Sequence, residues 1–427
     1  MLKSAAERDG HSNGKWHIQI HIRFAGTVYT NVGSVGLTPE NTQVLPSAEA
    51  PFTQTDIHFL ATNRGCRLEL PLQATEQIYG LGLQMKSFRQ NGKKKQLRVN
   101  SDPIADTGDS HAPVPLYVST AGYAVFVDTL RYACFYIGSH THLQREAQEE
   151  TSIADNTNDL YAAHENIVVV EIPAAAGVDI WLFAGPTMAQ AIQRYNLFSG
   201  GGYLPPVWGL GMWYRAYAGA DEAKVWEYAR MLRQEHIPCD VIGLEPGWQT
   251  HAYSCTYAFD RDRYSEPETL LDELAQQQFH VSLWEHIFVH PDAAIYADLK
   301  PFAGDYPVWG GLVPDYAVPE ATEIYAKHHR ETLAEMRISG FKLDECDNFD
   351  YVASPWSYPE MSQFPSGLDG EQMHMAMGNL YIQAVEKVFE PLRYRTLGSV
   401  RSEGAFAAKY PFVLYSDLYD QKYFFNN

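Results

Sequence analysis

Apolar and polar residues alternate along several short segments in the first half of the chain. In residues 17–24, "HIQIHIRF", every second position is apolar, so Ile18, Ile20, Ile22 and Phe24 share one face. Five further apolar segments follow, separated by Gly, Asn, Asp and Pro residues: 76–84, 123–129, 133–139, 166–172 and 178–185. Many short strands with almost no helical period predict an antiparallel β-sandwich.

The pattern changes after a helical stretch at 187–198 and a connector, "SGGGYLPP", at 199–206. The strands predicted beyond it are 207–214, 240–245, 280–286, 340–345, 395–400 and 411–417. The predicted helices are 221–236, 267–278, 319–338 and 371–390. Repeated strand–helix units predict a parallel sheet that is covered by helices.

A closed barrel and an open, dinucleotide-binding sheet share this pattern. No G-x-G-x-x-G segment follows a strand, which disfavours a dinucleotide-binding oxidoreductase. We therefore expect a β-sandwich domain at 1–198 and a (β/α)8 barrel domain at 199–427. Six barrel strands can be counted where a closed barrel needs eight, so we expect an incomplete barrel from a truncated gene product or a fragment.

Charge and composition limit the class of partner. The 427 residues carry a net charge of −20, which repels phosphate backbones and anionic lipid headgroups. No nucleic-acid partner and no membrane partner is therefore expected. The chain has 27 Tyr and 9 Trp residues, whose rings suit stacking against sugars.

The cysteines and the N-terminus bear on the cellular compartment. The five cysteines are scattered and include no C-x-x-C pair, which argues against a disulfide framework or a structural zinc site. No apolar signal core is seen, and no apolar run reaches the roughly 18 residues that a membrane span needs. A cytoplasmic protein is therefore expected.

Four carboxylates crowd together in residues 340–350, "GFKLDECDNFD", directly after a short apolar run: Asp344, Glu345, Asp347 and Asp350. Like charges repel, and each carboxylate that leaves water carries a desolvation cost. The crowding fits a metal site, a catalytic carboxylate or a hydrated loop.

The metal alternative fails on spacing. The segment lacks the D-x-D-x-D-G pattern of calcium loops, and the chain has no H-E-x-x-H zinc motif. His328 and His329 lie in the middle of a predicted helix on a polar stretch, where we expect them to be solvated. No metal and no cofactor is therefore expected.

Barrel enzymes carry their chemistry at the C-terminal ends of the strands. Strand parity places Lys342 and Asp344 on the lumen side, with Phe341 and Leu343 packed on the helices. Asp417 ends another predicted strand. Two carboxyls that face each other across a site are what glycoside hydrolysis requires. For any single acid, helix capping or ion pairing is the alternative.

Several segments carry a resemblance to a known family, in the family's order. They are 76–84, 97–103, 122–129, "YLPPVWGLGMW" at 203–213, "GFKLDECD" and "RSEGAFAAKYPFVLYSD". From about residue 70 onward the chain resembles glycoside hydrolase family 31, the retaining α-glycosidases that include α-glucosidases, α-xylosidases and α-galactosidases. The resemblance implies double-displacement hydrolysis of terminal α-linked sugars in oligosaccharide or α-glycoside substrates. It implies Asp344 as nucleophile, Asp417 as acid/base and Arg401 as a transition-state-binding residue.

The chain departs from the glucose-specific pattern of that family at two places. The second predicted barrel strand ends in "LEPGW", with Glu245 and Trp248 where glucose-specific members have an Asp-containing motif. Tyr415 and Ser416 precede Asp417, where Trp and Gly are usual. Because Glu245 is one methylene longer than Asp, we expect a slight preference for α-galactosides over α-glucosides and α-xylosides.

Further residues are expected to bind the sugar, shape its pocket or support the site: Arg401, Glu245, Trp248, Trp213, Trp284, Lys342 and Asp347. For each Trp, core packing is an equally good interpretation. Glu345 and Asp350 are expected to be loop charges. The alternative to an enzyme is an inactive remnant or a non-catalytic carbohydrate-binding protein.

Overall fold

The structure is a computed structural model that describes residues 3–6, 18–21, 48–49, 51–101, 103, 105–138, 167–348, 356–392 and 394–417. The chain divides into two compact units. Among the described residues, unit 1 holds those up to Arg98 and those from 103 to Gly201, and unit 2 holds Val99–Ser101 and Gly202–Asp417.

Unit 1 is built from antiparallel sheets. One sheet has four strands in the order β13-β10-β9-β5, and another has five in the order β3-β4-β12-β11-β6. The strands are β3 His58–Ala61, β4 Gly65–Pro71, β5 Ile78–Gly82, β6 Lys93–Gln96, β9 Pro113–Ser119, β10 Tyr123–Asp128, β11 Cys134–Ile137, β12 Ile167–Pro173 and β13 Asp179–Ala184. Two short two-stranded sheets are also present among the described residues: β1 Lys3–Ala6 with β2 Ile18–His21, and β7 Arg98–Val99 with β8 Asp109–Ser110.

The two larger sheets bury one common hydrophobic cluster. Along β4, buried and half-buried positions alternate, with Cys66, Leu68 and Leu70 buried. They share a cluster with residues of the other sheet, among them Val125 of β10 and Ile180 of β13. The predicted antiparallel strands are therefore present. Of the predicted segment 17–24, β2 covers part, and residues 22–24 lie outside the described residues.

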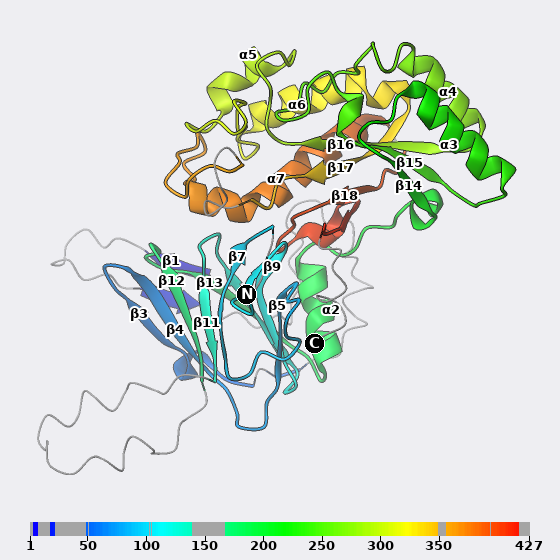
Figure 1. The fold of residues 1–427 in the computed structure, drawn as a ribbon. Helices are drawn as coiled ribbons and strands as arrows, with labels where there is room; N and C mark the ends of the chain where they lie inside the picture. Colours follow the sequence, from blue (N-terminus) through cyan, green and yellow to red (C-terminus); the bar gives the residue numbers. More distant parts are fainter. Residues whose placement is uncertain are drawn as a thin grey trace, which may run out of the picture. The chain divides into compact units, whose positions relative to one another are not determined.

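Unit 2 contains a curled six-stranded sheet in which every neighbouring pair is parallel (Figure 1). Its strands follow chain order: β14 Trp213–Ala216, β15 Val241–Leu244, β16 His280–His286, β17 Ile338–Asp344, β18 Gly398–Val400 and β19 Phe412–Leu414. The main helices are α3 Glu222–Gln234, α4 Pro267–Gln276, α5 Tyr296–Leu299, α6 Pro319–Thr332 and α7 Gly370–Phe389, while α2 Met188–Phe198 belongs to unit 1. This is the parallel strand–helix architecture of an incomplete barrel.

Local signals in the sequence start these helices. Asp221 and Asp369 accept backbone N–H groups at the N-termini of α3 and α7, and Gln372 completes a capping box. Pro267 and Pro319 occupy the first positions of α4 and α6, where the missing N–H costs nothing.

Two predicted boundaries in unit 2 are wrong. The predicted strand 207–214 is a 3₁₀ helix over Val207–Leu210 followed by β14 from Trp213. Its turn is closed by the backbone hydrogen bonds from Gly209 to the Pro206 carbonyl at 3.0 Å and from Gly211 to the Trp208 carbonyl at 3.2 Å. The predicted helix 319–338 ends at Thr332. A short 3₁₀ turn and Arg337, which adopts a left-handed conformation with φ 75°, then lead directly into β17.

The apolar face of β17 packs on the helices, as the strand parity predicts. The Phe341 ring lies 5.8 Å from that of Phe389 on α7 and 5.7 Å from that of His329 on α6. Phe341 and Leu343 are fully buried. Lys342 and Asp344 therefore lie on the opposite face of the strand.

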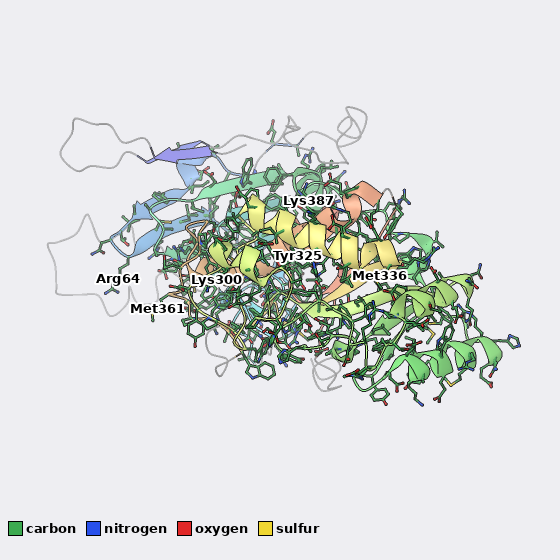
Figure 2. All side chains as sticks on the ribbon, turned by 90° about the horizontal axis from the view of Figure 1, so that it is seen from above. Arg64, Lys300, Tyr325, Met336, Met361 and Lys387 are labelled. Carbon is green, nitrogen blue, oxygen red and sulfur yellow. The ribbon has the colours of Figure 1, made fainter. Side chains whose placement is uncertain are left out.

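A buried polar network joins β16 to the two long helices. His329 and Glu285 are both fully buried, so the expectation of a solvated His329 is wrong. His329 Nε2 lies 3.1 Å from Glu285 Oε2, while Glu285 Oε1 accepts the hydroxyls of Tyr325 (labelled in Figure 2) and Tyr381. His329 Nδ1 lies 3.1 Å from the Tyr325 carbonyl oxygen, so both ring nitrogens have a hydrogen-bond partner.

All five cysteines are buried free thiols. Within the ranges that the structure describes, no helix combines the length and apolarity needed to cross a membrane.

Candidate active site

The C-terminal ends of the parallel strands gather the charged residues of unit 2. Asp344 is the last residue of β17, Arg401 follows β18, Asp417 lies just after β19, and Glu245 follows β15. Because neighbouring parallel strands end at the same edge of a sheet, these side chains come from different segments to one place.

Asp344 is held by three donors in a nearly buried position. Its side chain accepts the indole N–H of Trp284 at 2.7 Å, Nη1 of Arg401 at 2.8 Å and the backbone N–H of Glu345 at 2.9 Å. Burial by itself raises the pKa of Asp344, but the charges of Arg401 and Lys342 outweigh it and lower this pKa to about 2. Asp344 is therefore ionised at neutral pH.

One guanidinium serves several carboxylates. Arg401 Nη1 lies 2.8 Å from Asp344, 3.4 Å from Asp417 and 3.7 Å from Glu345, and its Nε lies 3.1 Å from Asp347. Burial alone lowers the pKa of Arg401, but the charges of Asp347 and Asp344 raise it above its ordinary value. The guanidinium is thus a permanent positive centre for the site.

The shared nitrogen limits the separation of Asp344 and Asp417. Asp344 Oδ1 and Asp417 Oδ2 lie 2.8 Å and 3.4 Å from Arg401 Nη1, so these oxygens cannot be further apart than the two distances laid end to end. The Asp417 side chain is 37% exposed, whereas that of Asp344 is 6% exposed. One carboxylate is buried and the other reaches solvent.

Glu245 is fixed by two basic residues. Arg215, which lies on β14, donates to both of its oxygens, from Nε at 2.8 Å and from Nη2 at 2.7 Å. Lys342 Nζ lies 3.3 Å from Glu245 and 3.8 Å from Asp344, and 5.0 Å from the centre of the Tyr415 ring. Lys342 therefore links two acids whose parent strands are separated by β16.

The three tryptophans expected in the pocket lie in different places. Trp284 binds Asp344 directly. Trp248 is fully buried, with its indole N–H bonded to the Trp284 carbonyl at 2.6 Å, so it lies behind Trp284. Trp213 is the first residue of β14, at the opposite end from Asp344, and donates to the Gly209 carbonyl.

An aromatic group adjoins Trp284 that the sequence reasoning did not single out. Tyr253 has its ring 5.4 Å from that of Trp284 and 5.1 Å from that of Trp309. Trp309 in turn lies 5.4 Å from Trp356. Tyr253 and Trp356 are 42% and 45% exposed, which leaves aromatic surface beside the acids. The Trp- and Tyr-rich loop after Asp344 was the available signal for Trp356.

Glu345 and Asp347 are not solvated. Glu345 is 4% exposed, adopts a left-handed conformation with φ 53°, and accepts from Asn348 Nδ2 at 3.1 Å, so the expectation of a loop charge is wrong. Asp347 is fully buried against Arg401. Asp350 lies outside the described residues.

The crowded acids converge on Arg401 rather than on a common cation site. Within the described part of the chain, no group of three or more His, Cys, Asp or Glu side chains is arranged to hold a metal ion. The site's positive charge comes from the three basic side chains already described: Arg401, Lys342 and Arg215.

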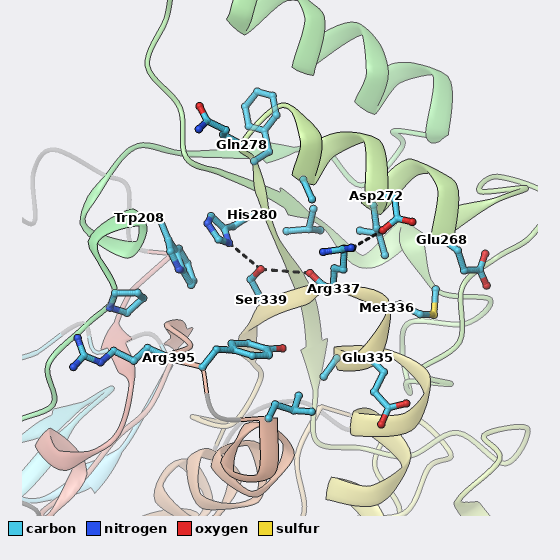
Figure 3. Close-up of a pocket in the computed structure, with 18 residues that line it drawn as sticks. Trp208, Glu268, Asp272, Gln278, His280, Glu335, Met336, Arg337, Ser339 and Arg395 are labelled. Atoms are coloured by element: carbon cyan, nitrogen blue, oxygen red, sulfur yellow. Dashed lines mark hydrogen bonds and ion pairs between the residues drawn. The ribbon is translucent and has the colours of Figure 1, made fainter.

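A separate cavity of about 990 Å³ opens at the other end of the strands. Figure 3 shows its wall, where His280 and Ser339, near the starts of β16 and β17, lie beside Trp208. The rings of Trp208 and His280 stack at 4.3 Å, and Arg337 pairs with Asp272. Neither Asp344 nor Asp417 lines this cavity, so it is separate from the carboxylate site.

Relatives that are named as glycosidases match parts of the chain. The α-xylosidase XylQ of Lactiplantibacillus pentosus is 25% identical over 293 residues, which are 65% of this chain and 35% of the relative. Alpha-glucosidase 2 of Bacillus thermoamyloliquefaciens is 33% identical over 104 residues, which are 24% of this chain and 13% of the relative. The chain thus spans about a third of the length of XylQ.

Solved structures share the fold. A Flavobacterium johnsoniae GH31 dextranase complexed with glucose matches with a TM-score of 0.70 at 19% identity, over 86% of this chain and 44% of the other. A GH31 α-xylosidase from a soil metagenome complexed with xylose matches with a TM-score of 0.67 at 18% identity, over 85% of this chain and 50% of the other. Residues 202–422, more than half of the chain, match the TIM-barrel domain of glycosyl hydrolases family 31. The chain belongs to glycoside hydrolase family 31.

Proposed function

We propose that the protein is a retaining α-glycosidase that hydrolyses terminal, non-reducing α-linked sugars by double displacement. The observation that carries the proposal is the contact of one Arg401 nitrogen with both Asp344 and Asp417. It holds one oxygen of each carboxylate against the same nitrogen, which supports the close spacing, about 5 to 5.5 Å between carboxyl groups, of retaining enzymes.

The environments of the two carboxylates suit different roles. Asp344, ionised by Arg401 and Lys342, attacks the anomeric carbon and forms a covalent glycosyl ester. Asp417, which is partly exposed, gives a proton to the departing glycosidic oxygen and then takes one from the water that cleaves the ester. Arg401 holds the nucleophile and binds the sugar beside it.

The sugar is proposed from the relatives and from Glu245. The relatives named above are an α-xylosidase and an α-glucosidase, and they give no support for an α-galactoside preference. Glu245 is engaged by Arg215 and Lys342, so it orients these donors, and Arg215, 46% exposed, presents its guanidinium outward. We therefore propose α-xylosides and α-glucosides ahead of α-galactosides.

The proposed domain layout follows from the match to glycoside hydrolase family 31. The two antiparallel sheets of unit 1, which bury a common cluster, are the layers of an N-terminal β-sandwich domain at 1–198. The parallel sheet belongs to the catalytic barrel domain at 199–427. Trp284, Tyr253 and Trp356 supply the aromatic wall of its sugar pocket.

The decisive experiment combines turnover with stereochemistry. The chain is incubated with 4-nitrophenyl α-xyloside, α-glucoside and α-galactoside, and the first-formed product is examined by NMR. We expect the α-anomer to appear first, and the Asp344→Ala variant to be inactive until azide restores turnover with a β-glycosyl azide as product. A β-anomer from the wild type, or an active D344A variant without azide, would overturn the mechanism. Binding of these sugars without any turnover would favour a carbohydrate-binding protein instead.

A further inference from the structure

Among the residues that the structure describes, the carboxylates of the site outnumber the basic groups that contact them. Asp344, Glu345, Asp347 and Asp417 all lie within 3.7 Å of the single guanidinium of Arg401. Lys342 is shared with Glu245, which Arg215 also holds. Carboxylates this close repel when all are ionised, and the favoured relief is that one of them keeps its proton.

The contacts distinguish Glu345 from the other three acids. Asp344 has three close donors, Asp347 contacts Nε of Arg401 at 3.1 Å, and Asp417, the proton donor of the proposed function, has a side chain that is 37% exposed. Glu345 has the longest contact with Arg401, 3.7 Å, and its other oxygen accepts from Asn348, a neutral amide. With 4% exposure it also has little water.

We propose that Glu345 stays protonated and uncharged while the enzyme works, and that it is a positioning residue for Asp344. A neutral Glu345 leaves the guanidinium of Arg401 to Asp344 and Asp347. An ionised Glu345 would compete for it and would add a negative charge next to the nucleophile. This inference rests on the proposed function for its catalytic meaning, but the protonation itself does not.

The surroundings of Glu345 shift its pKa in the direction that the proposal requires. Burial and the charge of Asp344 raise the pKa of Glu345 to about 7, against the lowering effects of Arg401 and of the Asn348 hydrogen bond. The titratable groups that face it are Asp344, Asp347, Arg401 and Tyr253. The pKa of Glu345 is higher in the folded protein than in the unfolded chain, where it is about 4.3. The contribution of Glu345 to folding stability is therefore fully present below about pH 4.3 and is lost as the pH rises through about 7.

A direct test observes the protonated carboxyl. Protein labelled with ¹³C at glutamate carboxyls is titrated by infrared spectroscopy in the wild type, in E345Q, in the double variant E386Q/E403Q and in the variant that combines all three changes. The double variant is the matched control, because burial also raises the pKa of Glu386 and Glu403. We expect a protonated carboxyl band that titrates near pH 7, persists in E386Q/E403Q and is lost when E345Q is added to that double variant. Its absence from E386Q/E403Q would overturn the proposal, even where E345Q does not fold.

Kinetics then test the positioning role. With an activated aryl α-glycoside, which needs no proton from Asp417, kcat/KM of the wild type should fall about tenfold between about pH 7 and about pH 8.5, while E345Q keeps its value. E345Q should retain activity that E345A loses, because the amide preserves the contact with Asn348. Equal alkaline limbs in wild type and E345Q would overturn the role. A chain without any turnover would count against the proposed function alone, since the infrared titration would still decide the protonation of Glu345.

Discussion

The guanidinium of Arg401 lies 2.8 Å from the Asp344 carboxylate, and the two side chains are only 10% and 6% exposed. A pair this deeply buried is screened little by salt or water. Because Nε of the same guanidinium contacts Asp347 at 3.1 Å, the planar fork fixes Arg401 at two points. A lysine could keep the charge but not both contacts.

Arg401→Lys should therefore lower kcat/KM by about 10- to 100-fold, the range expected for losing one hydrogen bond between charged groups. The measurement is steady-state kinetics with the best 4-nitrophenyl α-glycoside. Arg261→Lys is the matched control, because Arg261 pairs with Glu268 at the surface with 57% exposure and should tolerate the change. Wild-type kinetics in R401K would mean that Arg401 has no role in the reaction.

Trp284→Phe should raise the pKa of Asp344, because it removes an N–H donor that favours the ionised carboxylate. A hydrogen bond of about 1 kcal/mol corresponds to somewhat less than one pH unit. The acid limb of kcat/KM should therefore move to higher pH by about that amount. Trp213→Phe also loses an indole N–H, but one that bonds the Gly209 carbonyl, and its acid limb should not move. Coincident acid limbs in W284F and the wild type would contradict this role of the indole.

Asp417→Ala should affect substrates according to their leaving groups. A poor leaving group needs the proton, so its kcat/KM should fall by about 10²- to 10⁴-fold, while an activated aryl glycoside should react at nearly the wild-type rate in the first step. Azide should restore turnover and yield an α-glycosyl azide, the opposite anomer to that from D344A. Equal losses for both kinds of leaving group would remove Asp417 from the acid/base role.

Removing either partner of the Glu285–His329 pair should destabilise the fold. Both side chains are fully buried, so Glu285→Gln or His329→Gln should each lower the free energy of unfolding by about 3–5 kcal/mol, measured by urea denaturation. The double variant should cost less than the two single changes together. The exposed pair Arg337–Asp272, broken by D272N, should cost no more than about 1 kcal/mol. A loss of unfolding free energy at Glu285 or His329 as small as that at the surface pair would show that water reaches the buried network.

Periodicity predicted most of the architecture, because strand and helix periods are local properties. The helices α3, α4 and α7 and the strands β15 to β17 lie within a few residues of the predicted ranges. The failure at 207–214 is also physical: alternating apolar residues predict a strand, but a 3₁₀ turn over Val207–Leu210 leaves only the end of the segment in the sheet. The helix predicted over 319–338 ends at Thr332, and the 3₁₀ turn and left-handed Arg337 that follow it are not revealed by periodicity.

The sequence predicted the site through two features: the residue at which each strand ends, and the alternation of side chains between the two faces of a strand. They placed Asp344, Lys342, Arg401 and Asp417 together, since parallel strands end at one edge. They did not reveal that Glu345 is buried, because a left-handed residue after the strand breaks the alternation. The bidentate hold of Arg215 on Glu245 depends on side-chain conformations across two strands, which spacing along the chain does not determine.

The contact of the single Arg401 guanidinium with four acids has a consequence for how the site can evolve. An exchange at Glu345, Asp347 or Asp417 alters the charge that Arg401 offers to Asp344, so none of these positions can drift independently of the others. A lineage that changed its sugar by replacing one of them would need a compensating replacement at a second. The pocket around Trp284 and Tyr253, which contributes rings rather than charge, is freer to diverge. New specificities should therefore arise first in the aromatic wall and last among the acids.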